Sequence, residues 1–145
     1  MTTKSASESL LKEKISLKEA ITSLSSDLMY PSESDEKIDY FEMEVSTDEK
    51  LSIANFRMFN GIRPEVQIEE MEFELFFKPL MKIEEWFGEE EKKWAQDGLK
   101  LKELLTEKLK DIQILKIGKI EIIVYLFGKS EECKWEGLKT KLIET

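Results

Sequence analysis

Hydrophobic residues recur along the chain with spacings typical of helices in two long regions. From Ser7 to Ser25 they fall on one face at intervals of three and four residues, with lysines off that face, which predicts an amphipathic helix. The longest predicted helix runs from about Glu89 to Lys110, with acids in its first turn and leucines along one stripe. The shorter predictions are a helix from Leu51 to Phe59, stopped at Asn60-Gly61, and a buried turn or short helix over Leu75 to Leu80.

Alternating and continuous apolar runs predict the strands. Ile122 to Phe127 is apolar at every position, which is typical of a central strand covered on both faces. A turn rich in Ser and Asp, Tyr30 to Asp35, precedes the first strand. The expected strands are Lys37 to Val45, Glu65 to Phe73, Ile112 to Ile117, Ile120 to Phe127 and Leu138 to Leu142, with Gly128 to Gly137 as a loop.

These elements together predict an α+β fold in which helices cover an antiparallel sheet. Most strands are joined as hairpins, and the two-sided central strand needs cover on both faces, so a three-layer α/β/α sandwich fits best. No internal repeat or long Gly, Ser or Pro linker divides the sequence, and a single domain over residues 1–145 is expected, with residues 1–6 disordered.

The three tryptophans receive different predictions from their surroundings. Trp94 lies on the apolar stripe of the long helix, which predicts a core position. Trp135 stands between Lys134 and Glu136 in the expected loop, which favours partial exposure. Trp86, followed by Phe87, fits the core and the surface equally well.

The charge of the chain is uneven and strongly acidic in its middle. The net charge is −9, and residues 33–91 hold 18 acids against 6 bases, a net of −12, whereas residues 97–145 have a net of +1. Such a field repels phosphate backbones, so direct binding of nucleic acid is not expected. Acidity keeps a protein soluble, and it also steers a protein onto a basic partner.

Residues that carry catalysis are missing from the composition. The chain has no His, which removes the commonest general base near neutral pH and the commonest metal ligand. The six glycines form no phosphate-binding loop, and the acids show no calcium-loop spacing. Adjacent carboxylates such as Glu69-Glu70 point different ways on a helix or strand. The protein is therefore expected not to be an enzyme, and to have no cofactor and no metal of its own.

The sequence also bears on the compartment. No apolar run approaches the roughly 18 residues of a membrane span, and Met1 to Ser9 lacks a signal-peptide core. The single Cys133 cannot form an internal disulfide and is expected to be a passive loop thiol. A cytoplasmic protein with no membrane association is the expectation, monomeric when free.

A set of short segments, taken in order, resembles the nuclease A inhibitor family. No single one of them is specific, but their order and spacing through most of the chain are similar to the family. The segments are Asp27-Leu28-Met29-Tyr30, Ser32-Glu33-Ser34-Asp35, Phe76-Phe77, Glu84-Glu85-Trp86, Ile117 to Glu121 and the terminal Thr140 to Thr145.

The resemblance implies a fold like that of plant pathogenesis-related proteins of class 1. It also implies a function, the blocking of a metal-dependent, sugar-non-specific DNA/RNA endonuclease. In the family, a Glu of the Ser-Glu-Ser loop and a C-terminal Thr reach the nuclease's active site, and these carry over to Glu33 and Thr145. Thr145 would approach the nuclease's metal with its hydroxyl and α-carboxylate. The expected partner-binding set also includes Ser32, Ser34, Glu84, Trp86 and Glu144.

Two departures from the family pattern stand beside these expectations. Glu36-Lys37 replaces an aromatic residue and a proline after the turn, which allows a different loop shape, and Glu84 stands where an amide can occur. The alternative function is an acidic interaction module that binds a different basic protein without inhibiting a nuclease. An active-site plug requires Glu33 and Thr145 to converge at one edge of the fold, and a general module does not.

Overall fold

The helices and strands of the protein are those of an α+β fold. A computed structural model describes residues 16–44, 51–131 and 134–144. The described helices are α2 (Leu17–Ser25), α3 (Ile53–Phe59), α4 (Phe73–Met81) and α5 (Glu89–Lys108). The described strands are β1 (Met29–Tyr30), β2 (Glu36–Lys37), β3 (Asp39–Glu44), β4 (Ile68–Glu70), β5 (Lys110–Ile117), β6 (Glu121–Glu131) and β7 (Lys134–Ile143).

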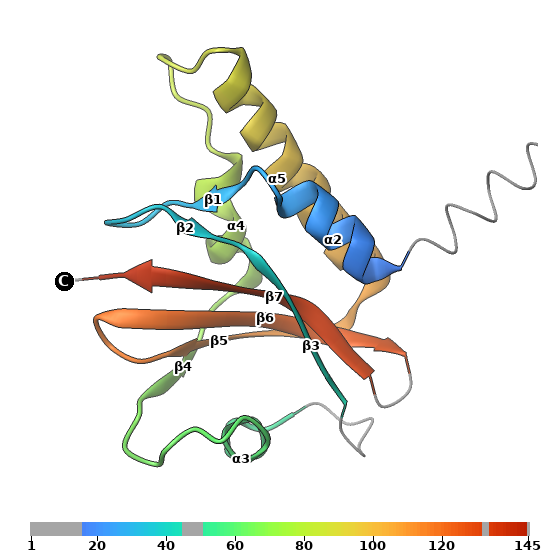
Figure 1. The fold of residues 1–145 in the computed structure, drawn as a ribbon, viewed down its shortest axis with the longest axis vertical. Helices are drawn as coiled ribbons and strands as arrows, with labels where there is room; N and C mark the ends of the chain where they lie inside the picture. Colours follow the sequence, from blue (N-terminus) through green and yellow to red (C-terminus); the bar gives the residue numbers. More distant parts are fainter. Residues whose placement is uncertain (1–15, 45–50, 132–133, 145) are drawn as a thin grey trace, which may run out of the picture.

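The main sheet has five antiparallel strands in the order β3-β7-β6-β5-β4, so β6 lies at its centre (Figure 1). β6 pairs with β5 on one side and with β7 along nearly its whole length on the other. The short strands β1 and β2 form a separate two-stranded hairpin. The expected class, α+β with a mainly antiparallel sheet, is confirmed. The likeness to the pathogenesis-related class 1 sandwich stays a prediction, as does the single domain.

Alternate side chains of β6 enter two different cores, as its continuous apolar run predicts. Ile122, Val124 and Leu126 pack in a cluster with residues of α2, α4 and α5. Phe127, on the opposite face, stacks at 5.1 Å on Phe56 of α3. Figure 1 shows the same arrangement, with α2, α4 and α5 on one side of the sheet and α3 on the other.

The helix predictions agree well with the structure. α2 begins after Ser16, whose hydroxyl accepts the Glu19 backbone N–H at 3.1 Å, a typical N-cap. The expected helix residues 7–15 and the expected disorder of residues 1–6 lie outside the described part of the chain. The segment predicted as a buried turn or short helix is α4, with Pro79 inside it. None of the helices that the structure describes is both long and apolar enough to span a membrane.

Two sequence predictions, one of a loop and one of a strand, have the wrong bounds. The expected loop from Gly128 to Gly137 is largely strand, because β6 continues to Glu131 and β7 begins at Lys134. Its polar side chains find partners there: Glu136, only 4% exposed, accepts the Tyr40 hydroxyl at 2.5 Å and that of Ser130. The expected strand from Glu65 to Phe73 shrinks to the three residues of β4, since α4 already begins at Phe73.

Trp94 and Trp135 exchange the roles that the sequence predicts. Trp135 is fully buried in β7, 6.0 Å from the ring of Phe127, because the polar run around it is paired strand and not a loop. Its side chain belongs to the core cluster that contains Phe56 of α3. Trp94 is 38% exposed. The buried face of α5 is formed by other residues: Ala95, Gly98, Leu101 and Leu105.

Small residues lie at the point where α5 meets the end of α4. A Cβ atom placed on Gly98 would be 2.7 Å from the Leu80 carbonyl oxygen, far inside van der Waals contact. The two helices therefore approach so closely that a larger residue does not fit at this position. Trp94, one helical turn before Gly98, is not part of this close contact and remains partly exposed. The same close approach fixes the loop between the two helices.

Replacing Ile122 by Asp tests the two-sided burial of β6. Ile122 is 3% exposed in the core beneath the helices, and an unpaired carboxylate there should cost several kcal/mol, on the order of 3–5, so the variant should be unfolded or strongly destabilised. Ile123→Asp on the same strand is the matched control, because Ile123 is 36% exposed. Urea denaturation followed by circular dichroism measures both. An equal loss of stability in the two variants would contradict this placement of β6.

Candidate functional site

The Ser-Glu-Ser turn forms the tip of the β1–β2 hairpin. The short strand β1 lies between α2 and the turn, so Glu33 does not directly follow the first helix. Within the turn, the Ser32 hydroxyl donates to the Ser34 carbonyl oxygen at 2.7 Å, and the Ser34 hydroxyl donates to a Glu36 carboxylate oxygen at 3.0 Å. Glu36, the departure from the family pattern, therefore takes part in the shape of this turn.

The turn is attached to the last described residues of the chain. The Ile143 backbone N–H donates to the Ser32 hydroxyl oxygen at 3.2 Å, across 111 positions of sequence. The Glu33 backbone N–H donates to the Ile143 carbonyl oxygen at 3.4 Å. At the base of the hairpin, the Thr140 hydroxyl donates to the Lys37 carbonyl oxygen at 2.8 Å. β7 therefore holds the hairpin at its tip and at its base.

Tyr30 anchors the hairpin from below. Its side chain is 2% exposed, its ring stacks on Phe76 at 4.7 Å, and its hydroxyl donates to the Phe76 carbonyl oxygen at 2.7 Å. Burial, and to a lesser degree the negative charge of Glu144, raises the pKa of Tyr30 well above its usual value. The phenol therefore stays protonated and remains a hydrogen-bond donor at neutral pH.

Glu144, the last described residue, lies at the same edge. Its backbone N–H donates to the Ile120 carbonyl oxygen at 2.9 Å, and its carboxylate is 3.4 Å from the Lys116 ammonium. It directly follows Ile143, whose N–H and carbonyl oxygen are both hydrogen-bonded to the hairpin turn. Thr145 falls outside the described residues. The structure therefore brings the turn and the penultimate residue together, whereas the convergence of Glu33 with Thr145 stays a prediction.

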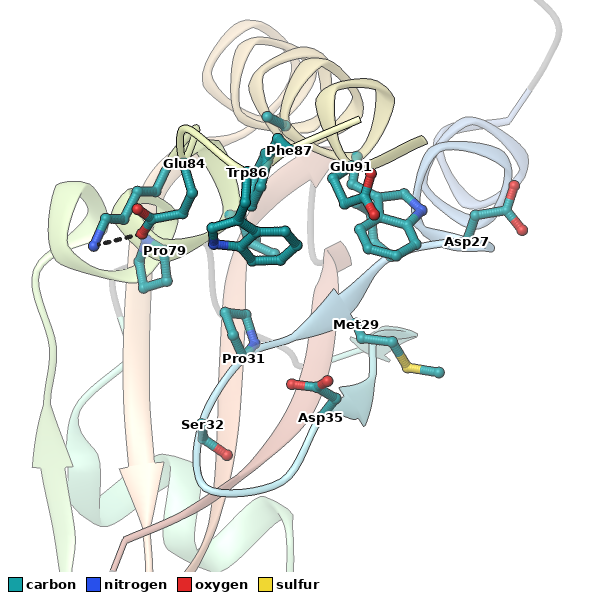
Figure 2. Close-up of a pocket in the computed structure, with 15 residues that line it drawn as sticks. Asp27, Met29, Pro31, Ser32, Asp35, Pro79, Glu84, Trp86, Phe87 and Glu91 are labelled. Atoms are coloured by element: carbon teal, nitrogen blue, oxygen red, sulfur yellow. Dashed lines mark ion pairs between the residues drawn. The ribbon is translucent and has the colours of Figure 1, made fainter. Parts of the chain in front are cut away.

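A cleft of about 560 Å³ separates the hairpin from the loop between α4 and α5. Ser32 lines it from the hairpin, and Glu84 and Trp86 line it from the loop (Figure 2). Trp86 is 72% exposed, so it belongs to the surface and not to the core. The Glu84 carboxylate is 2.9 Å from the Lys82 ammonium, an ion pair at the margin of the cleft.

The cleft also contains residues for which the sequence predicts no functional role. Helical spacing predicted a core position for Trp94. The prediction is wrong because spacing alone does not reveal where two helices approach most closely. Met29 and Asp35 belong to segments quoted for the family resemblance, but neither was given a role. The additional lining residues with a polar or aromatic side chain are Asp27, Asp35, Lys82, Phe87, Glu91 and Trp94. Among the described residues, no group of three or more His, Cys, Asp or Glu could hold a metal ion.

The model of a known family matches this chain over residues 15–145, and that family is described as the nuclease A inhibitor-like proteins. The chain belongs to this family. The resemblance stated from the sequence is thus confirmed over most of the chain. No curated protein matches the chain. Six of the seven partner-binding residues expected from the nuclease A inhibitor family lie in the described part, on the hairpin turn, at the end of β7 or beside the cleft.

Removing the Ser32 hydroxyl should detach the turn from the end of β7. Ser32→Ala leaves the Ile143 N–H without its acceptor, a loss of about 0.5–1.5 kcal/mol, and hydrogen exchange at that amide should accelerate. Ser34→Ala is the matched control, because its hydroxyl donates only to Glu36 within the hairpin. Amide exchange followed by NMR measures both variants. Unchanged exchange at Ile143 in Ser32→Ala would show that the hydroxyl does not hold the two segments together.

Proposed function

We propose that this protein inhibits a metal-dependent, sugar-non-specific endonuclease by inserting the Ser32–Ser34 turn and the end of the chain into its active site. Membership of the nuclease A inhibitor-like family supports a nuclease as the partner. The observation that carries the proposal is the attachment of the turn to Ile143, because it unites two segments that the family resemblance had identified separately.

The chemistry of such a site favours competition by carboxylates. A nuclease holds a phosphodiester between a divalent cation and cationic side chains, so a carboxylate at phosphate-like spacing takes the same ligands. Glu33 is exposed at the tip of the hairpin and would pair with an active-site arginine through two parallel hydrogen bonds. Thr145 would approach the partner's metal with its oxygens. The protein itself acts as a binding partner and not as a catalyst.

The arrangement of backbone hydrogen bonds supports inhibition without large rearrangement. A turn fixed to a sheet strand has already lost most of the conformational freedom that a flexible loop would lose on binding. The alternative, a general acidic module, requires no such fixed pair of segments. The acidic surface would then serve any basic partner, and Glu33 would contribute no more than other exposed acids.

Glu33→Ala tests the role of the turn. Removal of this carboxylate should leave an arginine of the nuclease unpaired and weaken the complex by about 2–5 kcal/mol, with folding unchanged because the side chain is exposed. Glu107→Ala, on the last turn of α5, is the control with the same change of charge. Inhibition constants against a sugar-non-specific nuclease measure both. Equal, small losses in the two variants would favour the general acidic module.

Deletion of Thr145 is the companion to this experiment. It should weaken inhibition as well, because the chain would then end one residue too early for its oxygens to reach the metal. The main-chain hydrogen bonds of Ile143 and Glu144 that hold the end of β7 are kept in the shortened chain, so the unfolding transition should not move. Full inhibition by the shortened chain would remove the end of the chain from the mechanism.

Salt should slow the association of the two proteins if the acidic surface guides it. Long-range attraction is screened over roughly 8–10 Å at ordinary ionic strength, so the association rate constant should fall steeply between low and physiological salt, while the dissociation rate constant changes little. Stopped-flow measurements over a salt series provide the test. An association rate that does not depend on salt would count against the acidic surface as the docking surface.

A further inference from the structure

The cleft beside Trp86 has more negative charge than its own cations balance. Four carboxylates line it, Asp27, Asp35, Glu84 and Glu91, against one ammonium group, that of Lys82. Lys82 is already paired with Glu84 at 2.9 Å. Among the described residues, neither Asp27 nor Asp35 has an ammonium or guanidinium group within 4.0 Å; the nearby Lys93, which interacts with Asp27 at longer range, is paired with Asp97 at 3.0 Å. The cleft therefore presents an excess of negative charge to whatever enters it.

The walls of the same cleft are aromatic and apolar. Trp86 and Trp94 both line it and are both exposed, by 72% and 38% of their surface. Figure 2 shows the indole of Trp86 reaching from the α4–α5 loop toward Pro31 of the hairpin, with Asp35 below it and Asp27 at the opposite margin. Met29, 50% exposed, lies between these two aspartates.

Such a combination of indoles and carboxylates fits one kind of ligand best. An indole face attracts a cation through its quadrupole, and tryptophan does so more strongly than the other aromatic residues. Carboxylates around the opening add direct charge pairing. A purely apolar side chain would gain from the indoles but would leave the carboxylates partly desolvated and unpaired, which is costly. A carboxylate or phosphate would be repelled.

We propose that this cleft binds a cationic side chain of the partner protein, an arginine, between Trp86, Trp94 and the carboxylates of Asp27 and Asp35. Arginine is favoured over lysine because its planar guanidinium both stacks on an indole and donates two parallel hydrogen bonds to a carboxylate. The identity of the partner rests on the proposed function, whereas the chemistry of the cleft does not. This contact is separate from that of Glu33, because Glu33 is not among the residues that line the cleft.

A binding experiment on the free protein tests the cleft without any nuclease. N-acetyl-arginine methylamide is titrated into the protein, and the three indole N–H signals are followed by NMR, assigned with Trp86→Phe and Trp94→Phe. The signals of Trp86 and Trp94 should move saturably, while that of Trp135, fully buried, stays fixed. N-acetyl-citrulline methylamide has nearly the same shape without the charge and should not bind. Equal shifts with both compounds, or none with arginine, would overturn the proposal.

Charge removal within the cleft provides the matched variants. Asp27→Asn combined with Asp35→Asn should weaken arginine binding by about tenfold or more. Glu69→Gln combined with Glu70→Gln removes the same charge from exposed residues of β4 and should leave arginine binding within about twofold. Both aspartates are exposed, so the cleft variant should fold normally. Equal weakening by the two double variants would mean that net charge, and not the cleft, attracts the cation.

The nuclease assay then separates the two proposals. If both are right, the cleft variant and Glu33→Ala each weaken inhibition, and arginine binding is lost only in the cleft variant. If Glu33→Ala weakens inhibition but the cleft variant inhibits fully, the cleft does not bind the nuclease and the proposed function stands. If arginine binds in the cleft but the unaltered protein inhibits no sugar-non-specific nuclease, the proposed function fails and the cation site stands as the docking point of another basic protein.

Discussion

The hairpin that carries the Ser-Glu-Ser turn cannot hold its own shape. Its two strands have two residues each, and an isolated two-stranded ribbon is at best marginally stable in water. Its conformation depends on β7, which binds its tip through Ile143 and its base through Thr140. β7 can do so because the long pairing with β6 already fixes it inside the sheet. The surface that we propose to bind the nuclease therefore depends on strand pairing inside the sheet.

This dependence explains why an early hairpin and the last strand meet at one site. The hairpin comes early in the sequence and β7 comes last, yet antiparallel pairing returns β7 beneath the hairpin. Tyr30, held by stacking and a hydrogen bond to Phe76, joins the hairpin to α4 as well. The close contact of Gly98 with Leu80 then fixes α5 and the loop that carries Trp86. Sheet, hairpin and loop form one continuous support.

The sequence predicted those elements whose side chains have one dominant environment. Ile122, Val124 and Leu126 enter one core and Phe127 enters the other, so the continuous apolar run was enough to predict the central strand. The sequence could not predict that Glu136 would be buried, because the hydroxyl that donates a hydrogen bond to its carboxylate belongs to Tyr40 of β3, 96 positions away. Trp94 and Trp135 were misplaced for the same reason: the contact that decides each is tertiary. The cleft was missed since its walls come from three separate segments.

The uneven charge of the chain follows from the places that its segments take in the fold. The nearly neutral C-terminal part supplies β5, β6 and β7, which form the interior of the sheet, where unpaired charge is costly. The acidic middle of the sequence supplies the hairpin, the edge strands β3 and β4 and the start of α5, where acids face water or favour a helix N-terminus. Glu91 illustrates the second case, because its carboxylate accepts the Gly88 N–H at 2.9 Å while it also lines the cleft. Burial therefore limits where the negative charge can reside, and the cleft between the hairpin and the α4–α5 loop is one of the places where it gathers.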